Sequence, residues 1–341
     1  MPTSKDVARL AGVSQSTVSY VMSGRRPISE KTRKRVEDAM AQLAFQPNAG
    51  ARALASRRSQ VIGLAIPFVP DLHRGSMMGF ISVIATTARQ SDYDILLVTD
   101  DEGPAGLERV VGQQLVDGLI IMQVEGDDAR VPVIRNLPVP SVLIGIPDRH
   151  EGLQCIDADF ELAGQLCVEE LAQVGHETVT LVNWQDAVVR RHAMNYVKRF
   201  HRGVDRAAAA AGLKVLHAPG RITISGMEKA VAKALEQTKG IPAFIAPDAA
   251  NQDLLVEALN NLGLVLGKDV SVVVNCSDSL AERQHIPLTT IGFEPDEVSR
   301  RVVNMIVRDL TDPTSRPHEA VELVRPVLKR RKSTLSQRPK R

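Results

Sequence analysis

From residue 61 onward, short apolar runs alternate with segments of helical periodicity over about 270 residues. Strand candidates such as 61–67, 118–122 and 270–274 are brief and consist mainly of Val, Ile and Leu. Strands that alternate with helices predict parallel, doubly wound α/β sheets. Because this stretch is longer than one such sheet usually needs, it predicts two lobes with a cleft between them.

The remaining elements of this pattern are expected at regular intervals. Further strands are predicted at 94–98, 141–144, 179–182 and 243–246, and helices at 77–89, 107–115, 162–173, 196–211 and 252–262.

Residues 4–45 have a different texture and predict three short helices. Thr3 can cap the first helix together with Asp6, and Gly12 then permits a tight turn. Ser14 and Ser29 are the expected caps of the second and third helices, at 15–22 and 30–44. The outer face of the third helix is expected to carry Glu30, Lys31, Arg33, Lys34 and Arg35. Two short helices joined by a glycine turn and braced by a third predict a helix-turn-helix unit.

Pro47 closes this unit, and a short helix is possible over 48–55. Gly50 weakens that helix by about 1 kcal/mol, and a helix this short is marginal alone in water. Residues 56–60 are polar and are interpreted as a linker.

Charge is unevenly distributed along the chain. The net charge is +2, but residues 1–58 carry +7, residues 59–328 carry −12 and residues 329–341 carry +7. A basic head on an acidic body indicates that the head contacts a polyanion. A merely lopsided solvated surface is the other interpretation.

Several functional classes lack support in the residues. Cys155, Cys167 and Cys276 form no Cys-x-x-Cys pair, which favours a reducing cytoplasm over disulfides or zinc. No signal-peptide core, apolar run of membrane-spanning length, phosphate-binding glycine loop or nucleophile elbow is found. We therefore expect a cytoplasmic protein with no membrane segment, catalytic residue, metal or cofactor.

The segment Lys5-Asp6-Val7-Ala8-Arg9-Leu10-Ala11-Gly12-Val13-Ser14-Gln15-Ser16-Thr17-Val18-Ser19 strongly resembles the head of the LacI/GalR family of transcription regulators. Phe45-Gln46-Pro47-Asn48, Ala51-Arg52-Ala53-Leu54-Ala55, Val116-Asp117-Gly118-Leu119-Ile120 and Pro287-Leu288-Thr289-Thr290-Ile291 extend the resemblance over nearly the whole chain.

This resemblance implies a multidomain protein, with an all-α helix-turn-helix head and a periplasmic-binding-protein-like α/β body. The expected DNA-binding domain is 1–46, the hinge and linker 47–60, the two-lobed effector-binding and dimerisation domain 61–331, and the basic tail 332–341. The first lobe is expected at about 61–157 and 288–318, and the second at about 158–287 and 319–331.

The resemblance also implies which head residues contact DNA. Gln15, Ser16 and Tyr20 would reach base edges from the second helix. Backbone and phosphate contacts are expected from Ser4, Ser14, Thr17 and Ser19. An ordinary polar helix face is the alternative interpretation of Gln15 and Ser16.

In the hinge, the resemblance implies DNA contacts by Asn48, Ala51, Arg52 and Leu54. Arg52 would anchor the backbone, and Leu54 would wedge into the minor groove. Alternatively, Leu54 only packs a linker helix.

The cleft departs from the family pattern. Asp159 occupies a family cleft position, but Phe200 stands where a sugar-clamping Arg is usual, with Arg199 and Arg202 close by. The usual Asn-Asp pair is Pro247-Asp248, and Cys276 replaces a second Asp. Each lost charge-assisted hydrogen bond weakens the case for an ordinary sugar.

The effector candidates from this comparison are Phe68, His73, Arg74, Asp159, Trp184, Arg199, Arg202, Asp248 and Cys276. Trp184 could stack on a sugar ring or belong to the core, and His73 could be structural.

The leading hypothesis is a repressor that binds a palindromic operator as a homodimer and responds allosterically to a sugar-like molecule. Three alternatives remain: an enzyme fused to a DNA-binding head, a transporter's solute-binding protein, and a regulator of the same type without small-molecule sensing.

Overall fold

The computed structural model describes residues 2–23, 26–45, 58–66, 74–99, 102–185, 194–220, 223–292, 295–315, 317 and 320–335. Six predicted site residues lie outside these ranges, namely Asn48, Ala51, Arg52, Leu54, Phe68 and His73. Among the described helices, none combines the length and hydropathy that a membrane crossing requires.

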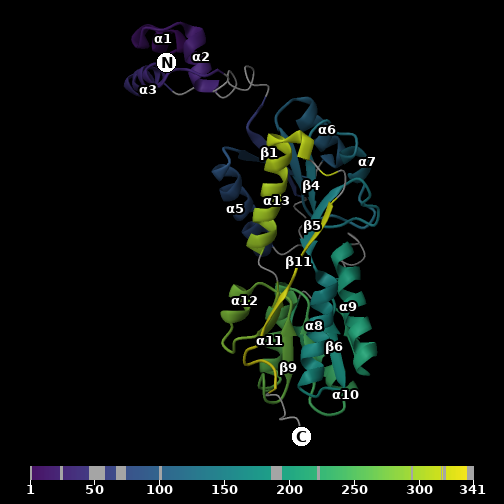
Figure 1. Cartoon of the computed structure of the whole chain (residues 1–341). Coiled ribbons are helices and arrows are strands. Elements are labelled where there is room, and N and C mark those ends of the chain that lie inside the picture. The colour runs from purple at the N-terminus through teal and green to yellow at the C-terminus, as the bar shows by residue number, and fades with distance from the viewer. Residues whose placement is uncertain are drawn as a thin grey trace.

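The head contains three helices, α1 (Ser4–Ala11), α2 (Gln15–Ser23) and α3 (Glu30–Gln42), as Figure 1 shows. Thr3 donates its backbone N–H and its hydroxyl to the Asp6 carboxylate at 2.9 and 2.7 Å, which confirms the predicted cap. Gly12 has φ of 62° and supplies the left-handed turn after α1. The three helices enclose their own apolar core, formed by Val7, Ala8, Ala11, Val18, Val36 and Ala39.

Arg35 differs from the sequence-based expectation of a purely solvated side chain. Its guanidinium donates to the carbonyl oxygen of Ala11 at 2.7 and 3.1 Å and to that of Gly12 at 3.1 Å. These carbonyls lie at the end of α1, where no helical N–H is available to them. Arg35 therefore joins α3 to the turn of the helix-turn-helix.

The first lobe contains a parallel sheet with strand order β11-β5-β4-β3-β1-β2. Its strands are β1 (Val61–Ile66), β2 (Asp94–Thr99), β3 (Gly118–Ile121), β4 (Ser141–Ile144), β5 (Gln154–Ala158) and β11 (Ala320–Val324). Its helices are α5 (Arg74–Gln90), α6 (Pro104–Gly112), α7 (Val131–Ile134), α13 (Pro295–Thr311) and the 3-10 turn Pro313–Ser315. The inner strands are buried on both faces, as expected for parallel strands covered by helices.

The second lobe contains a sheet with order β12-β10-β9-β8-β6-β7, in which only the β10–β12 pair is antiparallel. Its strands are β6 (Thr178–Val182), β7 (Lys214–Ala218), β8 (Ala243–Ala246), β9 (Ser271–Val274), β10 (Thr289–Gly292) and β12 (Val327–Lys329). Its helices are α8 (Phe160–Gln173), α9 (Asn195–Ala211), α10 (Ile224–Gln237), α11 (Ala249–Asn261) and α12 (Asp278–Glu282). The predicted doubly wound, two-lobed body is therefore confirmed.

Strand pairing corrects two of the expected lobe boundaries. β10 pairs with β9 and belongs to the second lobe, although residues 288–318 were assigned to the first. β11 pairs with β5 in the first lobe, although residues 319–331 were assigned to the second. The reason is that both sheets accept short apolar strands, so local sequence does not determine which sheet a strand joins.

Helices α8 and α9 approach each other at two glycines. A Cβ on Gly203 would lie 1.9 Å from the carbonyl oxygen of Glu161, and a Cβ on Gly164 would lie 2.3 Å from that of Phe200. Because both obstacles are backbone atoms, no side-chain rotation could make room for a methyl group. The two glycines thus determine how closely α9 packs on α8.

We predict that Gly203→Ala destabilises the protein by about 3 kcal/mol or more, because α9 must move away from α8. The matched control is Gly112→Ala at the exposed end of α6, where no atom lies within 4 Å of the new Cβ. That control should stabilise the folded protein by roughly 0.4–1 kcal/mol, because alanine lowers the conformational entropy of the unfolded chain. Urea denaturation of both variants measures the difference, and equal midpoints would contradict the packing argument.

Candidate nucleic-acid interface and effector cleft

The solvent-facing side of α2 carries most of the predicted base-contacting residues. Gln15, Ser16 and Ser19 are exposed, whereas Val18 is fully buried in the head core. The Ser14 hydroxyl accepts the Thr17 N–H at 3.1 Å, as predicted for the cap of this helix. The helix therefore offers a polar outer face, which a helix in the major groove requires.

Hydrogen bonds position several of these side chains. Ser14 Oγ lies 2.7 Å from Ser16 Oγ and 2.8 Å from Thr17 Oγ1. Gln15 Nε2 donates to Ser4 Oγ at 2.9 Å. Ser4, a predicted DNA contact, therefore also orients the Gln15 amide from the start of α1.

Tyr20 is half-buried, and the Arg26 guanidinium carbon lies 5.2 Å from the centre of its ring. A guanidinium over an aromatic face is a favourable cation–π contact. Sequence analysis did not single out Arg26, although its place shortly after α2 was a usable signal. It adds an exposed cation beside a predicted base-contacting ring.

In the body, the carboxyl ends of the two parallel sheets meet at the boundary between the lobes (Figure 1). The chain passes from β5 to α8 there, and Asp159 N donates to Val324 O at 2.9 Å, which joins two of the crossing segments. The carboxyl ends of such strands are where α/β folds bind ligands. Arg74, another predicted effector residue, is the first residue of α5.

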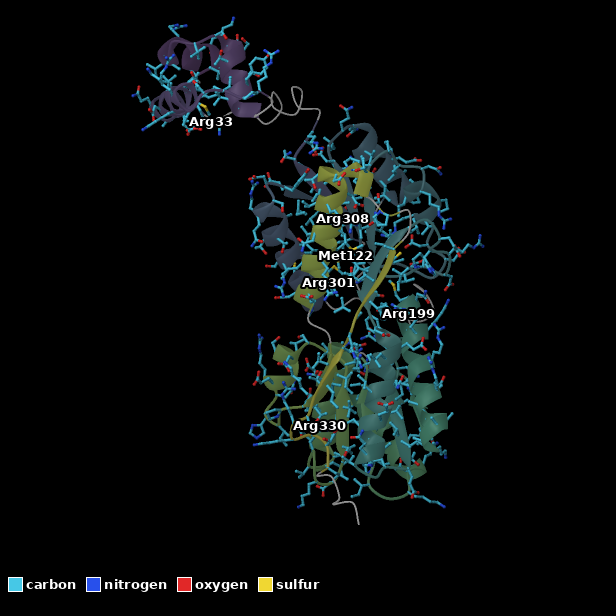
Figure 2. All side chains as sticks on the ribbon, in the orientation of Figure 1. Arg33, Met122, Arg199, Arg301, Arg308 and Arg330 are labelled. Carbon is cyan, nitrogen blue, oxygen red and sulfur yellow. The ribbon has the colours of Figure 1, made fainter. Side chains whose placement is uncertain are left out.

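Arg199 lies at this boundary, near the start of α9 (Figure 2). It forms an ion pair with Asp157 at the end of β5, and each residue is only 8% exposed. The Arg199 guanidinium carbon also lies 5.7 Å from the centre of the Phe160 ring. In the described part of the chain, its Nε finds no acceptor.

Asp157 is a site residue that sequence analysis missed, because Asp159 two residues later matched the family position. Burial raises the pKa of Asp157 to about 6, and Arg199 opposes that rise without cancelling it. A buried pair that joins two lobes has no local sequence signature.

Trp184 follows β6 and belongs to an aromatic cluster in the second lobe. It makes edge-on contacts with Phe200 at 5.3 Å and Tyr196 at 5.8 Å between ring centroids. Tyr196 in turn lies 5.1 Å from Phe160. Trp184 is 4% exposed, so in this structure its ring is part of the core.

Asp159 and Asp248 both begin helices. Asp159 Oδ1 accepts the Leu162 N–H at 3.0 Å, and Asp248 Oδ1 accepts the Asn251 N–H at 2.8 Å. Each carboxylate therefore caps a helix, α8 or α11, at the edge that faces the first lobe. A ligand contact at Asp159 would use its second oxygen, whereas at Asp248 the second oxygen already accepts from Asn251 Nδ2 at 3.0 Å, so a ligand contact there would follow a local rearrangement.

Two further effector candidates occupy different surroundings. Arg202 lies on the exposed side of α9 and pairs with Glu161 at 3.3 Å within the second lobe, away from Arg199's partner. Cys276 is buried after β9, its Sγ donates to Gln252 Oε1 at 2.9 Å, and burial raises its pKa to about 12. The structure thus does not bring these two side chains together.

Two buried amides at the same edge were missed by sequence analysis. Asn251 donates both to Asp248 Oδ1 and to Asp248 Oδ2, at 3.1 and 3.0 Å, and Asn275 donates to Pro247 O at 3.3 Å. Within the described residues, the amide oxygen of each has no donor. Buried acceptors without donors are expected where a ligand or water binds.

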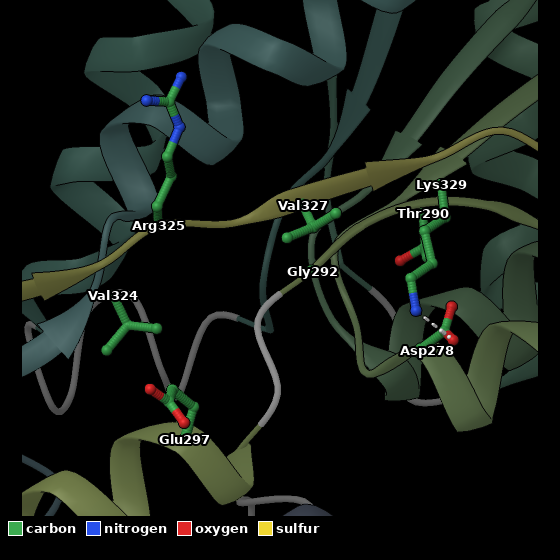
Figure 3. Close-up of a pocket in the computed structure, with 8 residues that line it drawn as sticks. All are labelled: Asp278, Thr290, Gly292, Glu297, Val324, Arg325, Val327 and Lys329. Carbon is green, nitrogen blue, oxygen red and sulfur yellow. Dashed lines mark hydrogen bonds and ion pairs between the residues drawn. The ribbon is translucent and has the colours of Figure 1, made fainter.

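A pocket of about 160 Å³ lies between two of the crossing segments (Figure 3). Gly292 and Glu297 line it from the β10–α13 crossing, and Val324 and Val327 from the β11–β12 crossing. None of the predicted effector residues that the structure describes is among its lining residues. Arg199 and Asn275 do not line it either.

Comparison with known families decides the identity of the chain. Residues 3–48 match the model described as bacterial regulatory proteins of the lacI family, and residues 168–334 match the periplasmic binding protein-like domain. The chain belongs to the LacI family. It is a DNA-binding transcriptional regulator, as the head resemblance implied.

Curated relatives cover most of this LacI-family chain. Catabolite control protein A of Priestia megaterium is 29% identical over 79% of the chain and 80% of its own length. The regulator CelR of Thermobifida fusca is 26% identical over 93% and 94%. The ribose operon repressor of Escherichia coli K12 is 27% identical over 92% and 94%. Their names describe a catabolite control protein, a transcriptional regulator and an operon repressor.

Solved structures share the fold. The lac repressor dimer bound to operator and the anti-inducer ONPF has a TM-score of 0.81 at 24% identity, covering 98% of this chain and 99% of that one. The CelR–cellobiose complex has a TM-score of 0.65 at 23% identity, covering 98% and 100%. The head and the two-lobed body are thus an established combination.

Proposed function

We propose that this LacI-family regulator is a repressor that binds a palindromic operator as a homodimer in the cytoplasm and responds to a neutral, sugar-like ligand between its lobes. The observation that carries the DNA-binding part is α2, which presents Gln15, Ser16 and Ser19 to solvent from a head whose core is complete without them. One such helix per chain must be paired to contact two half-sites.

In this proposal, Gln15, Ser16 and Tyr20 contact base edges, and Gln15 is held in register by Ser4. Ser14, Thr17 and Ser19 contact phosphates. Gln suits adenine because its amide can both donate and accept in the major groove. Arg26, beside Tyr20, adds a phosphate contact that every DNA sequence offers.

The hinge roles are proposed from the family resemblance. Asn48, Ala51 and Arg52 would contact the DNA backbone, and Leu54 would open a base step at the centre of the operator. The proposed division of the chain is a head at 1–46, a hinge and linker at 47–60 and a ligand-binding body at 61–331.

The ligand proposal is supported by acceptors at the lobe boundary. Asn251 and Asn275 present buried amide oxygens without donors among the described residues, and hydroxyl groups would supply those donors. A relative, CelR, was solved with cellobiose. Phe68, His73, Arg74, Asp159, Arg199 and Asp248 remain proposed ligand contacts.

A regulator of the same type without small-molecule sensing is the second candidate. It is favoured by Cys276, Trp184 and Arg199, since each already has a partner within the protein. In neither case does the proposed function include catalysis.

We predict that Gln15→Ala relaxes base preference at one position in each half-site, at a cost of about 1–3 kcal/mol for the preferred operator. Ser14→Ala is the matched control, because losing a helix cap should lower affinity about equally for all sequences. Genomic fragments that the wild type retards in a gel give a starting operator. Selection from randomised duplexes based on that operator then gives the base-preference profile of each variant. Identical profiles for the two variants would contradict the assigned roles.

We predict that Asn275→Leu removes the response to ligand without unfolding the protein. Its free energy of unfolding should fall by only about 1–3 kcal/mol, because the substitution takes the amide donor from the Pro247 carbonyl oxygen but also removes an amide oxygen that has no donor. Thermal-shift measurements with cellobiose, ribose and a panel of neutral mono- and disaccharides identify the ligand first. If no sugar raises the melting temperature of the wild type, the second candidate replaces the ligand proposal.

A further inference from the structure

The described contacts between the lobes include a cluster at the start of α9. Met194 forms an antiparallel bridge with Glu125, and Asn195 Nδ2 donates to Ile146 O at 2.6 Å. Lys198 Nζ lies 3.2 Å from Asp148 Oδ2. The Arg199–Asp157 ion pair completes the cluster. All four partners belong to the first lobe, after β3, after β4 or at the end of β5, whereas α9 belongs to the second.

We propose that residues 194–199, here called the α9 latch, hold the two lobes closed before any ligand binds, and that Asp157 positions Arg199 as its central contact. No predicted site residue other than Arg199 is part of it. The effect of the latch on ligand response rests on the proposed function. The contacts between the lobes do not depend on that function.

Burial distinguishes the contacts of the latch. Lys198 and Asp148 have side chains 56% and 53% exposed, so water screens their attraction, and they should favour closure at most a few-fold. Arg199 and Asp157 are each 8% exposed, and removing one partner leaves the other charge buried without compensation. Loss of the buried pair should therefore lower the fraction of closed molecules far more than loss of the exposed pair.

The geometry of the surrounding backbone fits a close contact. A Cβ on Gly126 would lie 2.8 Å from Asp148 Oδ2 and 3.0 Å from Lys198 Nζ. Glycine at this position thus leaves room for the exposed ion pair to form. On the other side, Phe160 covers the Arg199 guanidinium.

The latch is also attached to a rigid part of the second lobe. Gly203, one turn after Arg199, packs directly on the backbone of α8, and Gly164 of α8 packs on α9 in return. Because α9 cannot shift easily against α8, opening of the lobes must break the latch contacts rather than bend the helix away.

Closure should have a consequence for binding. A ligand that contacts both lobes binds only the closed state, so its apparent affinity falls in proportion to the closed fraction. Breaking the latch should therefore lower the apparent affinity for the ligand, although no residue at the carboxyl edges of β8 and β9 is altered.

The test measures lobe separation directly in the full-length protein. Nitroxide labels at Asp127→Cys in the first lobe and Ala209→Cys on α9 occupy exposed positions, and the three native cysteines are buried. Double electron–electron resonance without ligand should give one narrow distance distribution for the wild type. In Asp157→Asn, the ratio of closed to open molecules should fall at least about tenfold. Its distribution of distances between the labels should move to longer values and become broader.

Arg202→Gln is the matched control. Arg202 follows Arg199 by about one turn on the same helix, but its partner Glu161 lies in the same lobe. This variant should keep the wild-type distribution. A shift as large as that of Asp157→Asn would show that loss of any α9 guanidinium disturbs the lobes, and would overturn the proposal.

Two further variants keep the test decisive if Asp157→Asn folds poorly. Lys198→Glu places a like charge beside Asp148 at an exposed site and should open the lobes a few-fold. Asp157→Asn combined with Arg199→Gln should open the lobes less than Asp157→Asn alone but more than the wild type, because it breaks the contact and leaves no charge buried without a partner. The latch is overturned if the distance distribution is unchanged in both Lys198→Glu and Asp157→Asn. If Asp157→Asn is unfolded, the double variant takes its place in this comparison. Operator retardation is measured in parallel, so that failure of the wild type to bind DNA counts against the proposed function and not against the latch.

Discussion

The close contact between α8 and α9 determines the geometry at the boundary of the two lobes. Gly164 and Gly203 let the two helix backbones meet, with no space for a methyl group between them. Helix α8 follows directly from the β5 crossing, so its position is tied to the first lobe. α9 is placed by α8, and the first turn of α9 carries Asn195 and Arg199 to the first lobe. A boundary between lobes is thus controlled by packing inside one of them.

That boundary joins the two halves of the regulator. The segments that cross between the sheets are tied to one another, for example by the hydrogen bond from Asp159 N to Val324 O. The buried Asp157–Arg199 pair adds a contact that closes or opens as a unit, since a charge left alone in the interior is strongly unfavourable. Packed interfaces tend to have discrete arrangements rather than continuous ones, and in the proposed function this property would let a small ligand influence a distant DNA-binding head.

The candidate sites differ in how far sequence pattern could identify them. In the head, Thr3, Gly12 and Ser14 act within a few residues of their partners, and spacing alone indicated their roles. Arg35 acts across 24 positions on Ala11, and no local pattern marked it. In the cleft, Asp157 and Arg199 are 42 residues apart, and the buried amides Asn251 and Asn275 were not at the family positions that drew attention. Trp184 matched either a ligand contact or the core, and neighbouring rings from α9 place it in the core.

The sequence by itself determined the helix-turn-helix head and the doubly wound body, because capping, glycine turns and hydrophobic periodicity act over one or two turns of chain. Within the described residues, every strand and helix that these patterns predicted has a counterpart, and the possible helix over 48–55 lies outside them. The patterns did not predict β5, β7, β10, β11, β12, α7, α10, α12 or α13. Only the tertiary structure decided that β10 belongs to the second lobe and β11 to the first, and which charges meet across the boundary. The physical reason is that strand pairing and burial of an ion pair depend on residues that the fold brings together from distant parts of the chain.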